Sequence, residues 1–290
     1  MATNAAVRKA LQIGRSQATE VLKSREKARR RRKRALTASP GPAHVLLAEG
    51  DSWFDYPFHD VLKELEDEFG YDVESVAHKG DPIEAMAYGN GQLDDFTRKL
   101  EKLIDRGSPP RAILLSGGGN DISGAEFGML LNHAASAIAG LNEKVIEGVI
   151  DERIRMAYVT IMGAVTHVCE EKLGHTLPIL VHGYDYPVPD GRGFLGGLWL
   201  LPGPWLEPGF REKGYDAIAR RIRIAHDLIE RFNVMLEGVC ALPPFAHVRY
   251  VDLRNILSTG PGYKRWWANE LHPTPPGFRR IAERFKAAIP

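Results

Sequence analysis

The stretch Val45-Leu46-Leu47-Ala48-Glu49-Gly50-Asp51-Ser52-Trp53 decides the fold that we expect for this chain. Its apolar run is typical of a buried strand, and Gly50 ends that run. Asp51 and Ser52 both favour turns and helix N-caps. The pattern therefore predicts that the Ser52 hydroxyl lies at the C-terminal end of a strand, where open α/β sheets bind their ligands. By itself, a strand that ends in Gly-Asp-Ser is more often an ordinary turn, so the interpretation depends on the rest of the chain.

The composition of the 290-residue chain is that of an ordinary globular protein. Hydrophobic residues make up 44% and charged residues 26%, and this length is enough for one well-buried core. No apolar run reaches the length of a membrane span, and no apolar block follows the N-terminal basic residues as it does in a secretory signal. Cys169 and Cys240 match no metal or redox spacing. We therefore expect two reduced thiols in a cytoplasmic protein.

Charge is divided unevenly along the chain. Residues 1–40 contain twelve Lys and Arg but two Asp and Glu, whereas the remainder contains 26 basic and 35 acidic residues. We therefore expect 1–42 to be a basic helical or disordered arm with a linker, and 43–290 to be one domain. The arm is either a solvated extension or a contact for an anionic surface of nucleic acid, lipid or protein. Stacking on bases is not indicated, because no aromatic residues interleave with the charges.

After His44 the apolar patterns alternate between strand-like and helix-like segments. We expect strands over 45–49, 73–77, 112–116, 179–182 and 248–252. We expect helices over 61–69, 91–105, 141–173 with a break near Gly163, 215–236, and from about Pro276 to the C-terminus. This alternation predicts an α/β fold in which helices cover both faces of a mainly parallel, five-stranded sheet.

Residues 187–214 interrupt the alternation. They are rich in Gly and Pro and also contain large apolar residues, among them Trp199. Long irregular connections in compact domains are often lids or binding loops. The segment is therefore either an apolar wall or lid over a binding site, or an excursion that packs on the body or on another copy of the chain.

Four polar blocks follow predicted strands or precede the last helix. They are Gly50-Asp51-Ser52, His78-Lys79-Gly80-Asp81, Gly117-Gly118-Gly119-Asn120-Asp121 and Asn269-Glu270-Leu271-His272-Pro273. An ester hydrolase needs a nucleophile, a base that takes its proton, and donors for the developing oxyanion. Ser52 can be the nucleophile and His272 the base. Gly80 can offer a backbone N–H and Asn120 a side-chain N–H.

Each of these residues alone has a simpler interpretation. Gly80 is more often a turn glycine, and a histidine before a proline is often a surface residue. The glycine-rich stretch before Asn120 can be a flexible loop, since it lacks the Lys-Ser/Thr of a P-loop and the spacing of a dinucleotide fingerprint. All four blocks in this order are much harder to assign to chance.

The blocks resemble those of the SGNH hydrolase superfamily, the GDSL-type esterases and lipases, from about His44 to the C-terminus. The resemblance implies a flavodoxin-like, three-layer α/β/α sandwich. It implies ester hydrolysis through an acyl-Ser52 intermediate, with His272 as base and with no metal or organic cofactor. It also implies an oxyanion hole made from the Ser52 N–H, the Gly80 N–H and the Asn120 side chain.

Asn269 departs from this resemblance, because the family usually has Asp three residues before the histidine. An amide does not stabilise an imidazolium as a carboxylate does, and an Asp-to-Asn exchange at the orienting position of a serine protease lowers kcat about 10⁴-fold. Either the Asn269 carbonyl accepts the imidazole N–H in a weaker catalyst, or Glu270 or Asp252 orients the ring, or the protein is a slow or degenerate member. We favour Asn269 as the third catalytic residue.

The substrate is less well defined by the sequence. Trp53, Tyr184 and Trp199 are candidates for the wall of the substrate pocket, although core or strand-end packing also explains the first two. The apolar 187–214 segment favours a lipid or another hydrophobic acyl group, with an acetyl ester on a sugar as a further candidate. The alternative function is a weak or inactive SGNH-like protein whose basic arm binds nucleic acid, an anionic membrane or a protein partner.

Overall fold

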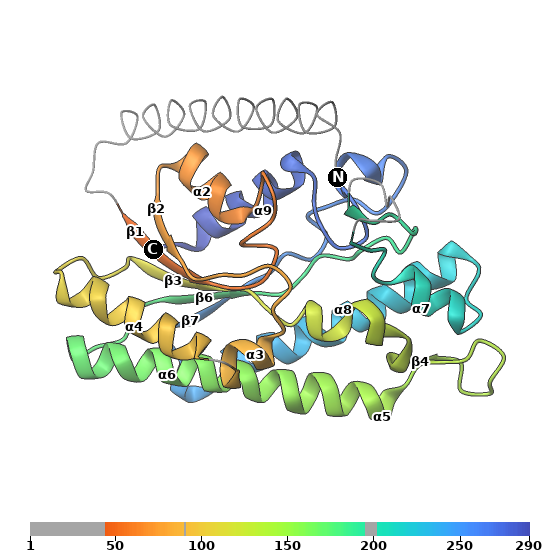
Figure 1. The fold of residues 1–290 in the computed structure, drawn as a ribbon, viewed down its shortest axis with the longest axis horizontal. Helices are drawn as coiled ribbons and strands as arrows, with labels where there is room; N and C mark the ends of the chain where they lie inside the picture. Colours follow the sequence, from red (N-terminus) through yellow and green to blue (C-terminus); the bar gives the residue numbers. More distant parts are fainter. Residues whose placement is uncertain (1–43, 90, 195–201) are drawn as a thin grey trace, which may run out of the picture.

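Five strands form one parallel sheet in the order β2-β1-β3-β6-β7 (Figure 1). The structure is a computed structural model that describes residues 44–89, 91–194 and 202–290. The strands are β1 Val45–Glu49, β2 Asp72–Ser75, β3 Ala112–Leu115, β6 Ile179–His182 and β7 Val248–Val251. The predicted five-stranded parallel sheet is therefore confirmed, although β2 ends two residues earlier than expected. The basic arm and Trp199 lie outside the described residues.

The central strands are almost entirely buried. Every residue of β3 and of β6 is buried, and Leu46, Leu47 and Ala48 of β1 have no exposed surface. Strands of a parallel sheet read as continuous apolar runs because helices cover both of their faces. This is why the three runs could be recognised in the sequence.

Helices on the two faces of the sheet complete a three-layer α/β/α sandwich (Figure 1). One layer contains α2 Val61–Phe69 and α9 Pro275–Ala288, which pack against each other. The opposite layer contains α3 Ile83–Tyr88, α4 Gln92–Asp105, α6 Arg155–Leu173 and α8 Ile218–Cys240. The predicted fold class is thus confirmed, while α3 was not expected from the sequence.

The long helical region after Leu141 differs from its prediction. It comprises α5 Glu143–Ile146, a π-helical stretch over Glu147–Ile154, and α6. The expected break near Gly163 is wrong, because α6 continues through that residue. A glycine inside a helix costs only about 1 kcal/mol, which the burial of six α6 side chains offsets.

The topology places the ends of two central strands beside each other. The strand order reverses between β1 and β3, and open α/β sheets bind ligands in the crevice at such a point. Ser52 follows β1 and Asn120 follows β3. The chain therefore delivers both side chains to the same crevice.

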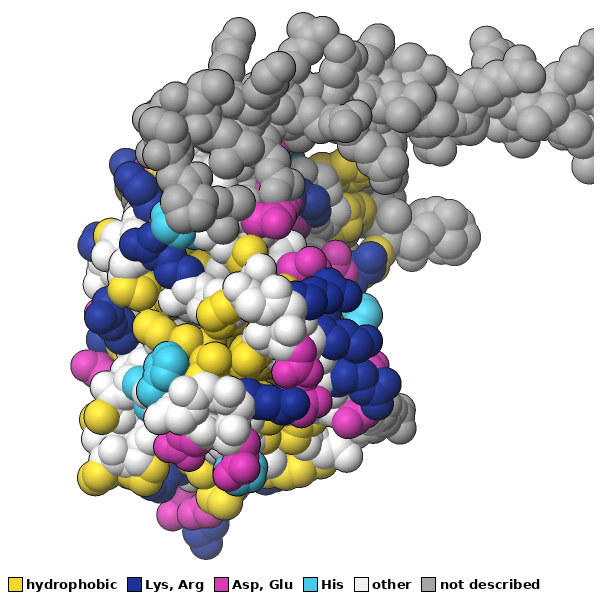
Figure 2. All heavy atoms as spheres, turned by 90° about the vertical axis from the view of Figure 1, so that its left-hand side faces the viewer, with side chains coloured by type: hydrophobic (Ala, Val, Ile, Leu, Met, Phe, Trp, Pro, Cys, Tyr) yellow, Lys and Arg dark blue, Asp and Glu magenta, His cyan; other side chains and the backbone are white. Residues whose placement is uncertain are grey.

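The described surface mixes charges of both signs. On the face in Figure 2, Lys and Arg side chains lie beside Asp and Glu side chains. Ion pairs between described residues include Lys99–Glu74, at 2.6 Å, and Lys172–Glu101, at 3.4 Å. Within the described residues, no helix combines the length and apolar character needed to cross a membrane.

Candidate active site

Ser52 lies in the tight turn that follows β1. Two successive backbone N–H groups after Trp53 donate to the Asp51 carbonyl, at 3.0 and 3.1 Å, and close the turn. Gly50 is needed because a Cβ at this position would lie 2.7 Å from the Cβ of Ser116. The end of β1 therefore approaches the end of β3 closely, and Ser52 remains half-buried at the crevice.

The Asp51 carboxylate stabilises this turn through hydrogen bonds. It is buried and accepts hydrogen bonds from the Trp53 N–H at 3.0 Å, the Ser116 hydroxyl at 2.8 Å and the Tyr184 hydroxyl at 2.5 Å. The Tyr184 oxygen also accepts the N–H of Gly119 at 3.1 Å. Tyr184 therefore links the nucleophile turn to the glycine-rich loop after β3.

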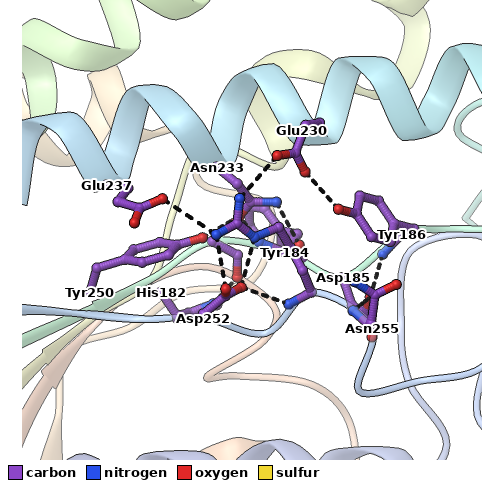
Figure 3. Close-up of polar contacts among 12 residues, drawn as sticks. His182, Tyr184, Asp185, Tyr186, Glu230, Asn233, Glu237, Tyr250, Asp252 and Asn255 are labelled. Atoms are coloured by element: carbon purple, nitrogen blue, oxygen red, sulfur yellow. Dashed lines mark hydrogen bonds and ion pairs between the residues drawn. The ribbon is translucent and has the colours of Figure 1, made fainter.

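Tyr184 is itself held by α8 (Figure 3). Its N–H donates to the Asn233 side-chain oxygen at 3.1 Å, and its carbonyl accepts the Asn233 amide at 2.9 Å. The Tyr250 hydroxyl donates to the same Asn233 oxygen at 2.8 Å. These contacts, like the one between Tyr184 and Asp51, join residues that are far apart in the sequence. None of them could therefore be predicted from a local motif.

His272 contacts the proposed nucleophile directly. Its Nε2 lies 2.7 Å from the Ser52 Oγ, and a backbone bridge between Trp267 and Pro273 shapes the loop that carries it. Burial lowers the pKa of His272 to about 3, because the charged imidazolium would be poorly solvated there. The ring is therefore neutral at pH 7 and can accept the Ser52 proton.

Asn269 contacts the other nitrogen of the imidazole. Its Oδ1 lies 3.1 Å from the His272 Nδ1, and its side chain is buried. An oxygen at this place assigns the ring hydrogen to Nδ1 and leaves the Nε2 lone pair for the hydroxyl of Ser52. The structure thus brings Ser52, His272 and Asn269 into one chain of hydrogen bonds.

The two carboxylates considered for the orienting role point elsewhere. Asp252 binds Arg254 through two hydrogen bonds of 2.8 Å, in a separate polar network beside α8 (Figure 3). Glu270 is fully buried and accepts four backbone N–H groups, at 2.7 to 3.1 Å, from Gly191, Trp205, Leu206 and Glu207. Neither carboxylate therefore orients His272.

Glu270 instead binds the apolar 187–214 segment to the loop of His272. Its carboxylate accepts N–H groups on both sides of the undescribed residues 195–201. The segment includes the short helix α7 Glu207–Glu212, whose first N–H is one of the Glu270 donors. Trp205 meets the His272 ring edge to face, with centroids 5.4 Å apart. The described part of the segment therefore forms an apolar wall beside the histidine.

The two expected oxyanion donors lie on adjoining loops. Asn120 donates one amide hydrogen to the Asp81 carbonyl at 3.1 Å and remains half-buried. The loop of Gly80 is tied to the nucleophile turn by the His78 N–H, which donates to the Gly50 carbonyl at 2.9 Å. Gly80 itself has φ +90°, a left-handed conformation that favours glycine, and open space lies beside it.

A cavity of about 50 Å³ adjoins these groups. Ser52, Asn120 and His272 border its polar side, and the described residues around it do not include Gly80. Its apolar side is formed by Ile122, Phe127, Leu206, Leu228, Ile229 and Trp267. Trp53 and Tyr184 also border it, whereas Trp199 lies outside the described residues.

Glu49 is a buried carboxyl group directly before the nucleophile turn. Its Oε1 accepts the Gly50 N–H at 2.8 Å and the Gln92 amide at 3.1 Å, while its Oε2 has no partner among the described residues. Burial raises the pKa of Glu49 to about 8. The group is therefore protonated in the folded chain at neutral pH, and no sequence signal distinguished it from an ordinary strand residue.

We expect the Glu49→Gln variant to be more stable than the wild type in mildly alkaline solution. The unfolded chain loses the Glu49 proton first as the pH rises above about 4.5, so the wild-type free energy of unfolding falls between about pH 4.5 and 8. The neutral amide removes this loss, and we expect a gain of about 4 kcal/mol at pH 8 but little gain at pH 4.5. Urea unfolding at both pH values measures it, with the exposed Glu212→Gln as control. An equal effect at the two pH values would contradict the assignment.

Among the described residues, no group of three or more His, Cys, Asp or Glu side chains is placed to hold a metal ion. The polar side chains beside the cavity include the Ser52 hydroxyl, the His272 imidazole and the Asn120 amide. Such a set suits proton transfer and the stabilisation of negative charge on oxygen.

No family model and no curated protein matches the chain, but solved structures do. The lipase Lip_vut3 from a goat rumen metagenome is 15% identical, with 84% of this chain and 96% of that chain covered and a TM-score of 0.50. A proposed SGNH hydrolase from Slackia heliotrinireducens is 12% identical, with 86% and 100% covered and a TM-score of 0.49. A family 3 carbohydrate esterase from Clostridium thermocellum is 13% identical, with 84% and 94% covered and a TM-score of 0.45. The likeness to the lipase shows a shared fold, in agreement with the three-layer α/β/α sandwich that the sequence predicts.

Proposed function

We propose that this chain is a carboxylic ester hydrolase with Ser52 as its nucleophile. The observation that carries the proposal is the 2.7 Å contact between the Ser52 Oγ and the Nε2 of a neutral, buried His272. A hydroxyl in contact with a neutral imidazole can pass its proton to that ring as it attacks a carbonyl carbon. The adjoining cavity supplies the place for the acyl group.

The reaction proceeds in two halves. In the first, the Ser52 oxygen bonds to the ester carbonyl carbon, and the His272 Nε2 takes the hydroxyl proton. The Ser52 N–H, the Gly80 N–H and the second amide hydrogen of Asn120 donate to the oxyanion. The C–O bond to the alcohol then breaks as His272 returns the proton to the leaving oxygen. In the second half, water attacks the acyl-Ser52 carbonyl and gives its proton to His272. The bond between the acyl carbon and the Ser52 oxygen then breaks, His272 returns the proton to that oxygen, and the acid is released.

The size of the cavity favours a short acyl group. A volume of about 50 Å³ holds a few water molecules, and therefore an acetyl or similarly short acyl chain. We propose an acetyl ester, such as an acetylated sugar, rather than a long-chain lipid as the substrate. The test is hydrolysis of 4-nitrophenyl esters from acetate to octanoate by the full chain. We expect the highest kcat/KM for the shortest esters, and no hydrolysis above the buffer rate for any ester would contradict the proposal.

We expect the Ile229→Ala variant to accept longer acyl chains. Ile229 lies on α8 and borders the apolar side of the cavity, so its truncation lengthens the space available to the acyl group. One methylene in an apolar pocket is worth about 10-fold or more in discrimination. We therefore expect the ratio of kcat/KM for butyrate over acetate to rise about 10-fold. Val239→Ala removes a buried side chain of the same helix away from the cavity and serves as control; an unchanged ratio in Ile229→Ala would argue against this acyl site.

The charge asymmetry of the sequence supports a second proposal for the basic arm. Residues 1–40 carry a strong positive charge, whereas the rest of the chain is acidic. We propose that the arm binds the protein to an anionic surface. This role applies both to an active hydrolase and to a protein of this fold that has lost its activity. Binding of the full chain to vesicles with anionic lipid should weaken with salt and disappear when residues 1–42 are deleted. Binding that survives the deletion would exclude this role.

A further inference from the structure

The side-chain amide of Asn269 has two possible orientations, and they have opposite consequences for His272. With Oδ1 facing Nδ1, the ring carries its hydrogen on Nδ1, and the Nε2 lone pair faces Ser52. With the NH₂ group facing Nδ1, the ring would carry its hydrogen on Nε2 and could not accept the Ser52 proton. A carboxylate presents an oxygen to Nδ1 in both orientations. Only an amide therefore needs to be held in one orientation.

Two backbone hydrogen bonds select the productive orientation, and a third, to Tyr56, helps to keep the amide from turning. The backbone N–H groups of Leu271 and His272 both donate to the Asn269 Oδ1, each at 2.9 Å. Only an oxygen can accept them, because an NH₂ group has no acceptor to offer. On the other side of the amide, the Asn269 Nδ2 donates to the Tyr56 hydroxyl oxygen at 3.0 Å. Tyr56 is thus the side chain that holds the amide nitrogen away from the imidazole.

The ring of Tyr56 also covers the imidazole. The Tyr56 and His272 rings are stacked, with centroids 4.2 Å apart and planes inclined by 19°. Phe194 and Phe278 pack against the Tyr56 ring, with centroids at 5.7 and 5.8 Å, and hold it in place. An aromatic face attracts a cation, so the ring favours the imidazolium that forms when Ser52 attacks.

We propose that Tyr56 is the positioning residue that compensates for the missing carboxylate. Its hydroxyl fixes the amide of Asn269 and its ring stacks on His272. Together, Tyr56 and Asn269 provide the orientation and part of the charge stabilisation that a carboxylate provides alone. The proposal rests on the role of Ser52 and His272 in ester hydrolysis. Burial raises the pKa of Tyr56 to about 12, so its hydroxyl stays neutral in the working range.

Tyr56→Phe tests the hydroxyl separately from the ring. We expect kcat to fall about 10-fold with little change in KM, because the Asn269 amide loses one of its three restraints and turns more often into the orientation that favours the unproductive tautomer of His272. The same substitution in the Asn269→Asp background should change kcat less than twofold, since either carboxylate oxygen accepts the Nδ1 hydrogen. Tyr88→Phe, at an exposed tyrosine, is the matched control and should leave both backgrounds unchanged.

A direct readout does not depend on catalysis. Nitrogen chemical shifts of the His272 ring should report hydrogen on Nδ1 in the wild type and a mixture of tautomers in Tyr56→Phe. An equal loss of kcat in both backgrounds would show a merely structural role, and an unchanged tautomer in Tyr56→Phe would overturn the proposal. A chain that hydrolyses no ester but shows the tautomer shift would refute the enzymatic function while leaving the positioning contact intact.

Discussion

Replacing Asn269 with Asp should raise kcat about 10²-fold. The carboxylate would stabilise the His272 imidazolium in the transition state, which the present amide cannot do. In a serine protease the reverse exchange costs about 10⁴-fold, in part because the histidine adopts the wrong tautomer. Here the amide oxygen already faces Nδ1, so the tautomer contribution is absent and the gain is smaller.

The site has the donors that a carboxylate at position 269 needs. The two backbone N–H groups that now bond to Oδ1 would remain, and the Tyr56 hydroxyl can rotate to donate to the second oxygen. Asn142→Asp, at the N-cap of α5, adds the same charge away from the site and is the matched control. A folded Asn269→Asp protein with unchanged or lower kcat would show that Asn269 does not orient the base.

Wild-type kcat/KM should stay nearly constant between pH 7 and 5. Burial lowers the pKa of His272 to about 3, so the base remains neutral and active across this range. A histidine with the usual pKa of about 6.5 would lose about 25-fold over the same interval. In Asn269→Asp the new negative charge favours the imidazolium and raises the pKa of His272, so activity should fall on the acid side.

The pH dependence of kcat/KM must be distinguished from a loss of activity that is caused by acid unfolding. Because the folded pKa of His272 is depressed, its contribution to stability is present above about pH 6.5 and is lost as the pH falls below that value. Circular dichroism at pH 5 establishes that the chain is still folded when the rates are measured. A fall in kcat/KM centred near pH 6.5 in a folded wild-type protein would contradict a buried, uncharged base.

The sequence predicted the sheet well because its strands are continuous apolar runs. It also singled out Ser52 and Asn120, which follow strands whose carboxyl ends share one edge of the sheet, and His272, which lies in the polar block before the last helix. It did not predict the course of the long helix, where burial outweighs the weak helix propensity of Gly163.

The contacts around Asn269 could not be predicted, because they depend on side-chain directions in an irregular loop. Glu270 follows Asn269 directly, yet it points to the backbone of the apolar segment rather than to His272. Tyr56 lies 213 residues from Asn269 in sequence and meets it only in the folded chain. The burial of Glu49 is likewise a tertiary property that an isolated strand does not reveal.

Labelling with a fluorophosphonate tests the central claim most directly, because this probe bonds covalently to a serine whose hydroxyl is activated by a base. Intact-mass and peptide mass spectrometry of the full chain should show a single adduct on Ser52. The adduct should be absent from Ser52→Ala and form far more slowly in His272→Ala. A wild-type chain that forms no adduct, or a Ser52→Ala variant that is labelled equally, would contradict a nucleophilic Ser52 activated by His272.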